Sequence, residues 1–240
     1  MRPIKLLAIS ASPRKEGNCA FLLNEVLKCI NECSFPVDLE KESLAGKRID
    51  GCCGCLACYK NGGCCVIKDD FESLRQKWKD ADCVLYCTPV YVAGIPGQLK
   101  CFLDRLNNSD FGLPVPSLRY MKTISVISQG GDFFGGGAEL TMLDIIRHAA
   151  MIKCVFIPPD GSYIASGGWV WDSHTKAMED KAKKGTYDYE LTLKTARSIV
   201  FRSVETAAML LEGAAVLKER LEGDPHYSAF YERVNKKNTG

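Results

Sequence analysis

The stretch Ile4–Asn18, IKLLAISASPRKEGN, decides the fold that this sequence predicts. It opens with the short apolar run Ile4–Ile9, which is typical of a strand buried in a parallel sheet. A turn rich in hydroxyl and basic side chains follows, and after Asn18 apolar residues recur at helical spacing. The stretch therefore predicts one βα unit with a polar turn at the carboxyl end of its strand.

The same alternation of apolar runs and amphipathic stretches continues along the chain, as in a parallel sheet with crossover helices. The remaining strands are expected at Val37–Ser43, Cys83–Thr88, Lys122–Ser128 and Val155–Pro158. These units predict an α/β fold with a doubly wound, five-stranded parallel sheet in the order 2-1-3-4-5. Residues 1–160 are expected to form this domain, and residues 161–240 a mostly helical C-terminal extension.

The extension contains Leu191–Leu221, which is expected as one long amphipathic helix or two shorter ones. Its apolar stripe favours a homodimer or homotetramer, although the same stripe could simply cover the parent domain. The residues of the stripe are Val204, Ala207, Leu210, Leu211 and Leu217.

Charge and hydropathy exclude several classes of partner. The 31 basic and 29 acidic residues offer no basic stripe for nucleic acid. No stretch approaches the roughly 20 apolar residues that span a bilayer, and the apolar run near Met1 is too short for a signal peptide. We therefore expect a cytoplasmic protein with neither a nucleic-acid nor a membrane partner.

The polar turn after the first strand suits a phosphate group. Hydroxyl, guanidinium and amide side chains can converge there on a dianion, helped by the dipole of the following helix. The alternative is a surface turn with a helix cap at Asn18. The turn lacks the glycine spacing of dinucleotide and nucleoside triphosphate loops, so those ligands are disfavoured. The candidate residues are Ser10, Ser12, Arg14 and Asn18.

Two further loops are expected at the same edge of the sheet. Thr88–Tyr91 ends the third strand and is followed by Gly94, and Ser128–Gly131 ends the fourth. In the order 2-1-3-4-5, strands one and three flank the switch point, so their loops face each other across one crevice. One side of the crevice can hold a phosphate and the other a flat ring. The loop Ser128–Gly131 can then contact the polar edge of the ring.

Cysteine is unusually abundant. The count of thirteen is odd, which argues against a fully paired disulfide framework. Six cysteines fall within Cys52–Cys65, and four of them follow the pattern C-x2-C-x2-C-x5-C. Four thiolates are the usual complement of a [4Fe-4S] cluster, while a zinc knot, a redox disulfide or unused thiols remain alternatives. The four are Cys52, Cys55, Cys58 and Cys64, with Cys53 and Cys65 as neighbours.

Three motifs together resemble a known family. The SxSPRxxxN turn, the TPVY segment with LKxFLDR downstream, and the cysteine-rich stretch leading into Asp69-Asp70 resemble the NADPH-dependent FMN reductase superfamily, and within it the iron-sulfur flavoproteins. The resemblance covers roughly residues 4–160 and implies a flavodoxin-like fold that binds FMN. One departure is Cys19, where many relatives have a threonine; a thiol is the poorer hydrogen-bond donor. The implied FMN-binding residues are Ser10, Ser12, Arg14, Asn18, Cys19, Pro89, Val90, Tyr91, Gly94, Ser128, Gln129, Gly130 and Gly131.

The resemblance also implies a function, namely an FMN-dependent oxidoreductase whose [4Fe-4S] cluster exchanges electrons with the flavin, with transfer across a dimer interface favoured. The family pattern selects Cys52 over Cys53 and Cys64 over Cys65 as ligands. Ferredoxin or NAD(P)H is the expected electron donor and a small molecule the acceptor. No residue is assigned a catalytic role, because the flavin itself carries the redox chemistry.

Three alternatives remain open from the sequence. A cluster-free NAD(P)H-dependent FMN, quinone or nitro-compound reductase would oxidise hydride without iron. A non-catalytic redox sensor or electron carrier would exchange electrons only with protein partners, and rapid turnover of a small acceptor would exclude it. A zinc-stabilised binding module would contain zinc and no flavin.

Overall fold

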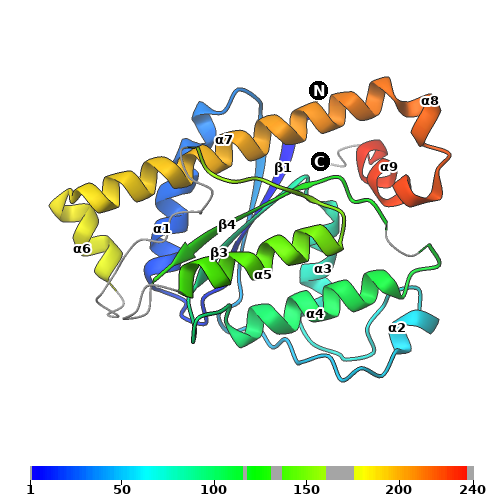
Figure 1. Ribbon diagram of the computed structural model, residues 1–240, viewed down its shortest axis with the longest axis horizontal. Helices are drawn as coiled ribbons and strands as arrows, with labels where there is room; N and C mark the ends of the chain where they lie inside the picture. The colour runs from blue at the N-terminus through cyan, green and yellow to red at the C-terminus, as the bar shows by residue number, and fades with distance from the viewer. Residues whose placement is uncertain (1, 116–117, 131–136, 161–175, 237–240) are drawn as a thin grey trace.

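The computed structural model describes residues 2–115, 118–130, 137–160 and 176–236 (Figure 1). It contains one sheet of five parallel strands in the order β2-β1-β3-β4-β5, which confirms the predicted fold class and strand order. The strands are β1 (Ile4–Ser10), β2 (Val37–Ser43), β3 (Cys83–Pro89), β4 (Thr123–Gln129) and β5 (Val155–Phe156).

Helices cover both faces of the sheet, so β1, β3 and β4 are buried almost throughout. Helices α1 and α7 pack on one face, and α3, α4 and α5 lie on the other (Figure 1). The helices are α1 (Asn18–Leu27), η1 (Lys28–Glu32), α2 (Ala57–Lys60), α3 (Phe71–Asp80), α4 (Gly97–Phe111), α5 (Gly137–Met151), α6 (Ala177–Lys184), α7 (Tyr187–Val216), α8 (Lys218–Leu221), η2 (Pro225–Tyr227) and α9 (Ser228–Asn235).

Helix α7 is a single helix of 30 residues that crosses the sheet. In the predicted apolar stripe, Val204, Ala207 and Leu211 are buried in the main core, whereas Leu217 is 42% exposed. The stripe therefore covers the parent domain. Assembly into a homodimer or homotetramer stays a prediction, and the contacts between subunits would have to involve surfaces other than this stripe.

The sequence pattern assigns the wrong face of α5 to the core. Leu140, Leu143, Ile146 and Ala150 are expected inside, but Leu140 is 49% and Leu143 39% exposed. Both that set and the set observed in the core recur at helical spacing, so periodicity does not distinguish them. The buried residues of α5 are Gly137, Thr141, Met142, Ile145, His148 and Ala149.

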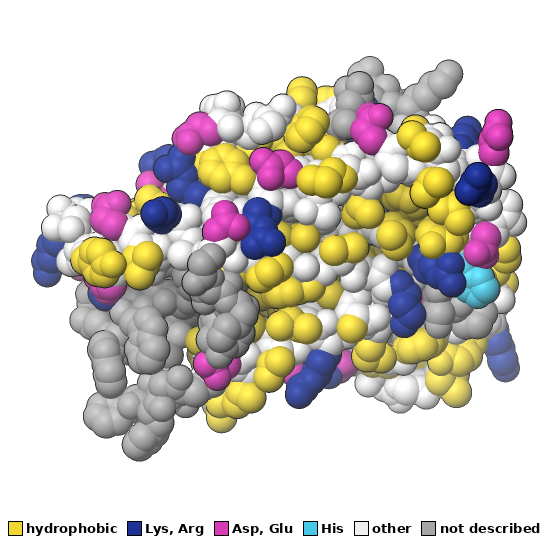
Figure 2. Space-filling view, turned by 45° about the horizontal axis from the view of Figure 1, so that its top comes forward, with side chains coloured by type: hydrophobic (Ala, Val, Ile, Leu, Met, Phe, Trp, Pro, Cys, Tyr) yellow, Lys and Arg dark blue, Asp and Glu magenta, His cyan; other side chains and the backbone are white. Residues whose placement is uncertain are grey.

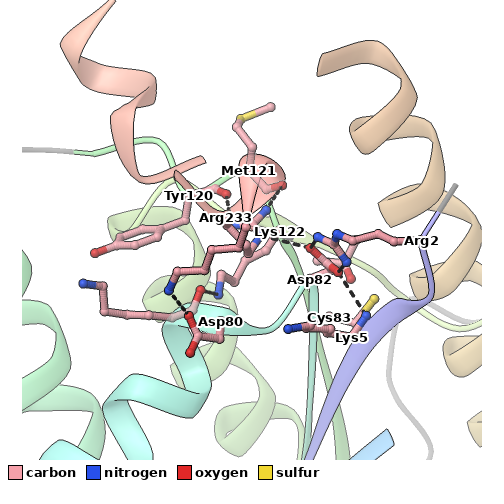
Figure 3. A network of polar contacts seen from close by, with 12 residues as sticks. Arg2, Lys5, Asp80, Asp82, Cys83, Tyr120, Met121, Lys122 and Arg233 are labelled. Carbon is pink, nitrogen blue, oxygen red and sulfur yellow. Dashed lines mark hydrogen bonds and ion pairs between the residues drawn. The ribbon is translucent and has the colours of Figure 1, made fainter. Parts of the chain in front are cut away.

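The amino end of the sheet is joined to the C-terminal helices by a buried charge network (Figure 3). Asp82, immediately before β3, accepts hydrogen bonds from Arg2 at 2.6 and 2.9 Å and from Arg233 of α9 at 3.0 Å. Arg233 also donates to the carbonyl oxygens of Tyr120 at 2.8 Å and Met121 at 3.1 Å. One carboxylate thus anchors α9 to the end of the sheet opposite the polar loops.

Charged and apolar side chains are interspersed on the face shown in Figure 2, and neither sign of charge dominates it. No helix in the described ranges is long and apolar enough to cross a membrane.

Candidate functional site

Two buried hydroxyl groups at the carboxyl edge of the sheet lack partners. The Oγ atoms of Ser10, at the end of β1, and Ser128, near the end of β4, are buried without a hydrogen bond to any described residue. Between them on β3, the Thr88 hydroxyl donates to the Pro89 carbonyl at 3.2 Å. Because buried polar groups are nearly always paired, the two unpaired hydroxyls are candidate partners for the polar atoms of a ligand.

The turn after β1 places further polar groups beside Ser10. Ser12 is 5% exposed, and its Oγ accepts a hydrogen bond from the Arg14 amide at 3.1 Å. Asn18 begins α1, and Gly17 before it supplies no side-chain cap. The first turn of a helix is where backbone amides commonly bind an anion. The Asn18 Oδ1 atom accepts from the Met178 amide at 3.1 Å, an additional contact that sequence reasoning missed.

The loop after β3 forms a tight turn. Tyr91 and Gly94 exchange backbone hydrogen bonds at 2.8 and 3.0 Å. Between them Val92 and Ala93 have φ values of 47° and 59°, in the left-handed region, where a β-branched side chain is strained by about 1–3 kcal/mol. Val92 is fully exposed and Tyr91 is 42% exposed, so the turn presents an apolar surface at the polar edge.

The loop after β4 meets the other two. The backbone carbonyl of Gln129 accepts a hydrogen bond from the Val90 amide at 3.1 Å. The side-chain oxygen of Gln129 accepts one from the Cys19 thiol at 3.7 Å. Cys19 is 2% exposed, so its thiol braces Gln129 within the protein. Gly130 has a φ of +103°, which favours glycine, and Gly131 lies outside the described residues.

Close packing of α5 against the β3 loop gives the first prediction. A Cβ atom on Gly137 would overlap Val90 Cγ1 and lie 3.2 Å from Ala93 Cα. Gly137→Ala is therefore expected to displace this loop, to destabilise the fold by about 1–3 kcal/mol and to weaken ligand binding at this edge. Gly213→Ala in α7, with no atom within 4 Å of the added methyl, is the control in a denaturant titration. Equal stability of the two variants would contradict the prediction.

The cysteine-rich loop encloses a cavity of about 40 Å³. Of the four predicted ligands, Cys52, Cys55 and Cys58 line this cavity and Cys64 does not. Within the described parts of the chain, no three Cys, His, Asp or Glu side chains are grouped so as to hold a single metal ion. Five of the twelve residues that line the cavity are nevertheless cysteines, whose thiolates are the donors that iron-sulfur clusters use. The cysteines around it are Cys52, Cys53, Cys55, Cys58 and Cys65.

A loop that follows β2 is expected at the carboxyl edge of a parallel sheet, but the cysteine-rich loop does not remain there. It runs along α4, where the Cys58 thiol donates to the Asn108 carbonyl and the Asn108 amide donates to the Cys52 sulfur, both at 3.5 Å (Figure 1). Asn108 lies 11 residues beyond Gly97, where α4 leaves the carboxyl edge, which is a rise of roughly 16 Å along the helix axis. The loop is long enough to leave the edge, and strand order alone does not reveal this.

Arg105 and Asp69 form a buried ion pair that the sequence does not predict. Asp104 and Arg105 are expected to pair at a helix end, but Asp104 pairs with the exposed Lys100, whereas Arg105 is 1% exposed. A usable signal is the spacing of Arg105 and Asn108, which places both on the face of α4 that lines the cysteine cavity.

The two histidines that the structure describes, His148 and His226, contribute to neither region. His148 is buried in α5 against Asn107 at 3.2 Å, and burial lowers its pKa to about 3. His226 is exposed beside Asp224. His174 lies outside the described residues.

Known proteins resemble this chain in sequence and in fold. A curated iron-sulfur flavoprotein of Methanocaldococcus jannaschii is 40% identical over 207 residues, which cover 86% of this chain and 99% of the relative. An iron-sulfur flavoprotein of Methanosarcina thermophila is 31% identical over 70% of this chain and 83% of its own. Among solved structures, RosB with a bound flavin intermediate has a TM-score of 0.60 at 15% identity, covering 92% of this chain and 88% of that one, which supports the fold alone.

The family model described as NADPH-dependent FMN reductase matches residues 4–167, a range that contains the polar edge, the cysteine-rich loop and all five strands. The chain therefore belongs to the NADPH-dependent FMN reductase family.

Proposed function

We propose that this chain is an FMN-dependent oxidoreductase that binds FMN across the carboxyl ends of β1, β3 and β4 and exchanges single electrons between FMN and a [4Fe-4S] cluster. Family membership supports the FMN-dependent oxidoreductase. The observation that carries the location is the pair of buried, unpartnered hydroxyls of Ser10 and Ser128 at one edge of the sheet. This edge is the switch point where doubly wound sheets bind ligands.

In this proposal the chain binds and orients the cofactor. Ser10, Ser12, Arg14, Asn18 and the first amides of α1 hold the phosphate, because hydroxyls, a guanidinium and a helix start all favour a dianion. The β3 loop and the β4 loop hold the ring from two sides. When bound, FMN supplies the one- and two-electron chemistry. The proposed ring contacts are Pro89, Val90, Tyr91, Gly94, Ser128, Gln129, Gly130 and Gly131, with Cys19 bracing Gln129.

The cluster is proposed at the cysteine loop, with Cys52, Cys55, Cys58 and Cys64 as ligands. The donor chemistry supports it, since each of four thiolates binds one iron of such a cluster. Relatives that match most of this chain bear the name iron-sulfur flavoprotein. Cys65 lines the cavity and is the competing candidate for the fourth position.

The position of the loop along α4 bears on the electron route. The rise of roughly 16 Å along α4 within one chain favours transfer to the FMN of a second copy, and hence a homodimer or homotetramer. Ferredoxin or NAD(P)H is the proposed donor and a small molecule the acceptor.

Ser10→Ala tests the location of FMN. The change is expected to weaken FMN binding about ten- to a hundredfold, because hydrogen bonds to charged groups contribute about 1.5–3 kcal/mol. It should leave the apoprotein as stable as wild type, since the hydroxyl has no partner there. Titration of apoprotein with FMN and thermal unfolding of the apoprotein measure the two effects.

Ser73→Ala, on the exposed face of α3, is the matched control and should change neither quantity. An FMN affinity of Ser10→Ala equal to that of wild type would place FMN elsewhere.

A further inference from the structure

Arg105 closes the base of the cysteine loop. Its guanidinium donates to the Asp50 carbonyl at 3.2 Å and to the Ile67 carbonyl at 3.3 Å, and it pairs with the Asp69 carboxylate. These partners lie immediately before and after the segment that carries the six cysteines. One side chain of α4 therefore holds both ends of the loop.

Asp69 completes this closure, and its side chain is fully buried. Its carboxylate accepts hydrogen bonds from the Asp50 amide at 2.8 Å and the Phe71 amide at 3.1 Å. Burial alone would raise the pKa of Asp69, but the hydrogen bonds from Arg105 and from the two amides hold it below its usual value. The carboxylate stays ionised at neutral pH, and the two ends of the loop are joined by a charged pair.

Arg105 also borders the cavity that the cysteines line. Arg105 is part of the wall of the cavity that Cys52, Cys58 and Cys65 line, whereas Asp69 is not. The Nε atom of Arg105 is buried without a hydrogen-bond partner among the described residues. Arg105 thus borders the cavity directly, whereas the carboxylate that balances its charge does not, and one buried donor of Arg105 remains without a partner among the described residues.

We propose that Arg105 is a positioning residue for the cluster, which fixes the base of the cysteine loop and raises the reduction potential of the cluster by placing a permanent positive charge against the cavity. The inference rests on the proposed function of this loop. Reduction adds one electron from the donor, breaks no bond and makes the cluster more negative, so a neighbouring buried cation stabilises the reduced form. Charge and hydrogen bonds outside the ligand shell commonly tune metal sites in this way.

Two substitutions separate the charge of Arg105 from its geometry. Arg105→Met removes both, so the midpoint potential should become more negative and iodoacetamide should alkylate the loop thiols of iron-free protein faster. Arg105→Lys keeps a point charge but loses the planar fork, so it should restore most of the potential without restoring slow alkylation. Lys100→Met, on the same helix but in an exposed pair with Asp104, should match wild type in both.

The readouts are an anaerobic redox titration followed by electron paramagnetic resonance, and mass spectrometry of alkylated peptides. A wild-type potential and a wild-type alkylation rate in Arg105→Met would overturn the inference. If Arg105→Met does not fold, Arg105→Lys is compared with wild type instead. An alkylation rate of Arg105→Lys equal to that of wild type would then contradict the proposal. Wild-type protein that contains FMN but no iron would refute the proposed cluster, while the alkylation comparison would still test the hold of Arg105 on the loop.

Discussion

Replacing Cys58 with alanine is expected to abolish iron binding and to leave FMN bound. The Cys58 thiol lies against α4, with its hydrogen bond to the Asn108 carbonyl, and lines the proposed cluster cavity. A [4Fe-4S] cluster needs all four thiolates, whereas the FMN edge lies roughly 16 Å away along α4. Iron, sulfide and FMN per chain after anaerobic purification measure the effect.

Matched cysteine variants complete this test. Cys33→Ala, at the end of η1 and outside the loop, should keep its iron. Cys64→Ala should lose iron and Cys65→Ala should keep it, as the family pattern implies. The reverse result for these two would transfer the fourth ligand to Cys65. A full iron content in Cys58→Ala would contradict the whole ligand set.

The second large effect is on stability, at the opposite end of the sheet. Asp82→Asn is expected to lower the free energy of unfolding by about 3–5 kcal/mol at pH 7, because Arg233 is then left buried without its counter-charge. Asp82 is 1% exposed and accepts hydrogen bonds from two arginines (Figure 3). Urea unfolding at equilibrium measures the loss.

The effect of Asp82 has a defined pH dependence. Burial alone would raise its pKa, but the hydrogen bond from Arg2 and the charges of Arg233 and Arg2 hold the pKa below its usual value. A depressed pKa stabilises the fold above the unfolded value of about 3.9 and loses this contribution as the pH falls through the folded value. The difference between wild type and Asp82→Asn should therefore be full at pH 7 and shrink below about pH 4.

Lys236→Met is the control for this prediction. It breaks the exposed pair between Lys236 of the C-terminal segment and Asp80, which should cost no more than about 1 kcal/mol. If Asp82→Asn and Lys236→Met were equally stable, the buried network would not anchor α9.

The sheet and its polar edge were predictable from sequence because each depends on local chemistry. Short apolar runs identified β1, β3 and β4 within one residue at each end, and the mostly polar β2 has its predicted bounds. The hydroxyl-rich turn at Ser10 and Ser12 and the Thr88–Tyr91 segment each follow a strand directly, so the sheet order is enough to bring them together.

The features that sequence reasoning missed depend on tertiary packing. Helix α5 carries two apolar stripes, and contact with the sheet selects the one with Met142 and Ile145. The path of the cysteine loop along α4 follows from contacts such as that of Cys58 with Asn108, which spacing within the loop does not reveal. Arg105 pairs with Asp69, 36 residues away, although Asp104 is adjacent to it in sequence.

The most direct test of the account is an absorption spectrum of anaerobically purified protein, with FMN, iron, sulfide and zinc assayed on the same sample. The account predicts one FMN with about four irons and four sulfides per chain, and no zinc. FMN without iron would leave a cluster-free reductase and contradict the two-centre proposal. Protein that contains no flavin after incubation with FMN would contradict the proposed function altogether.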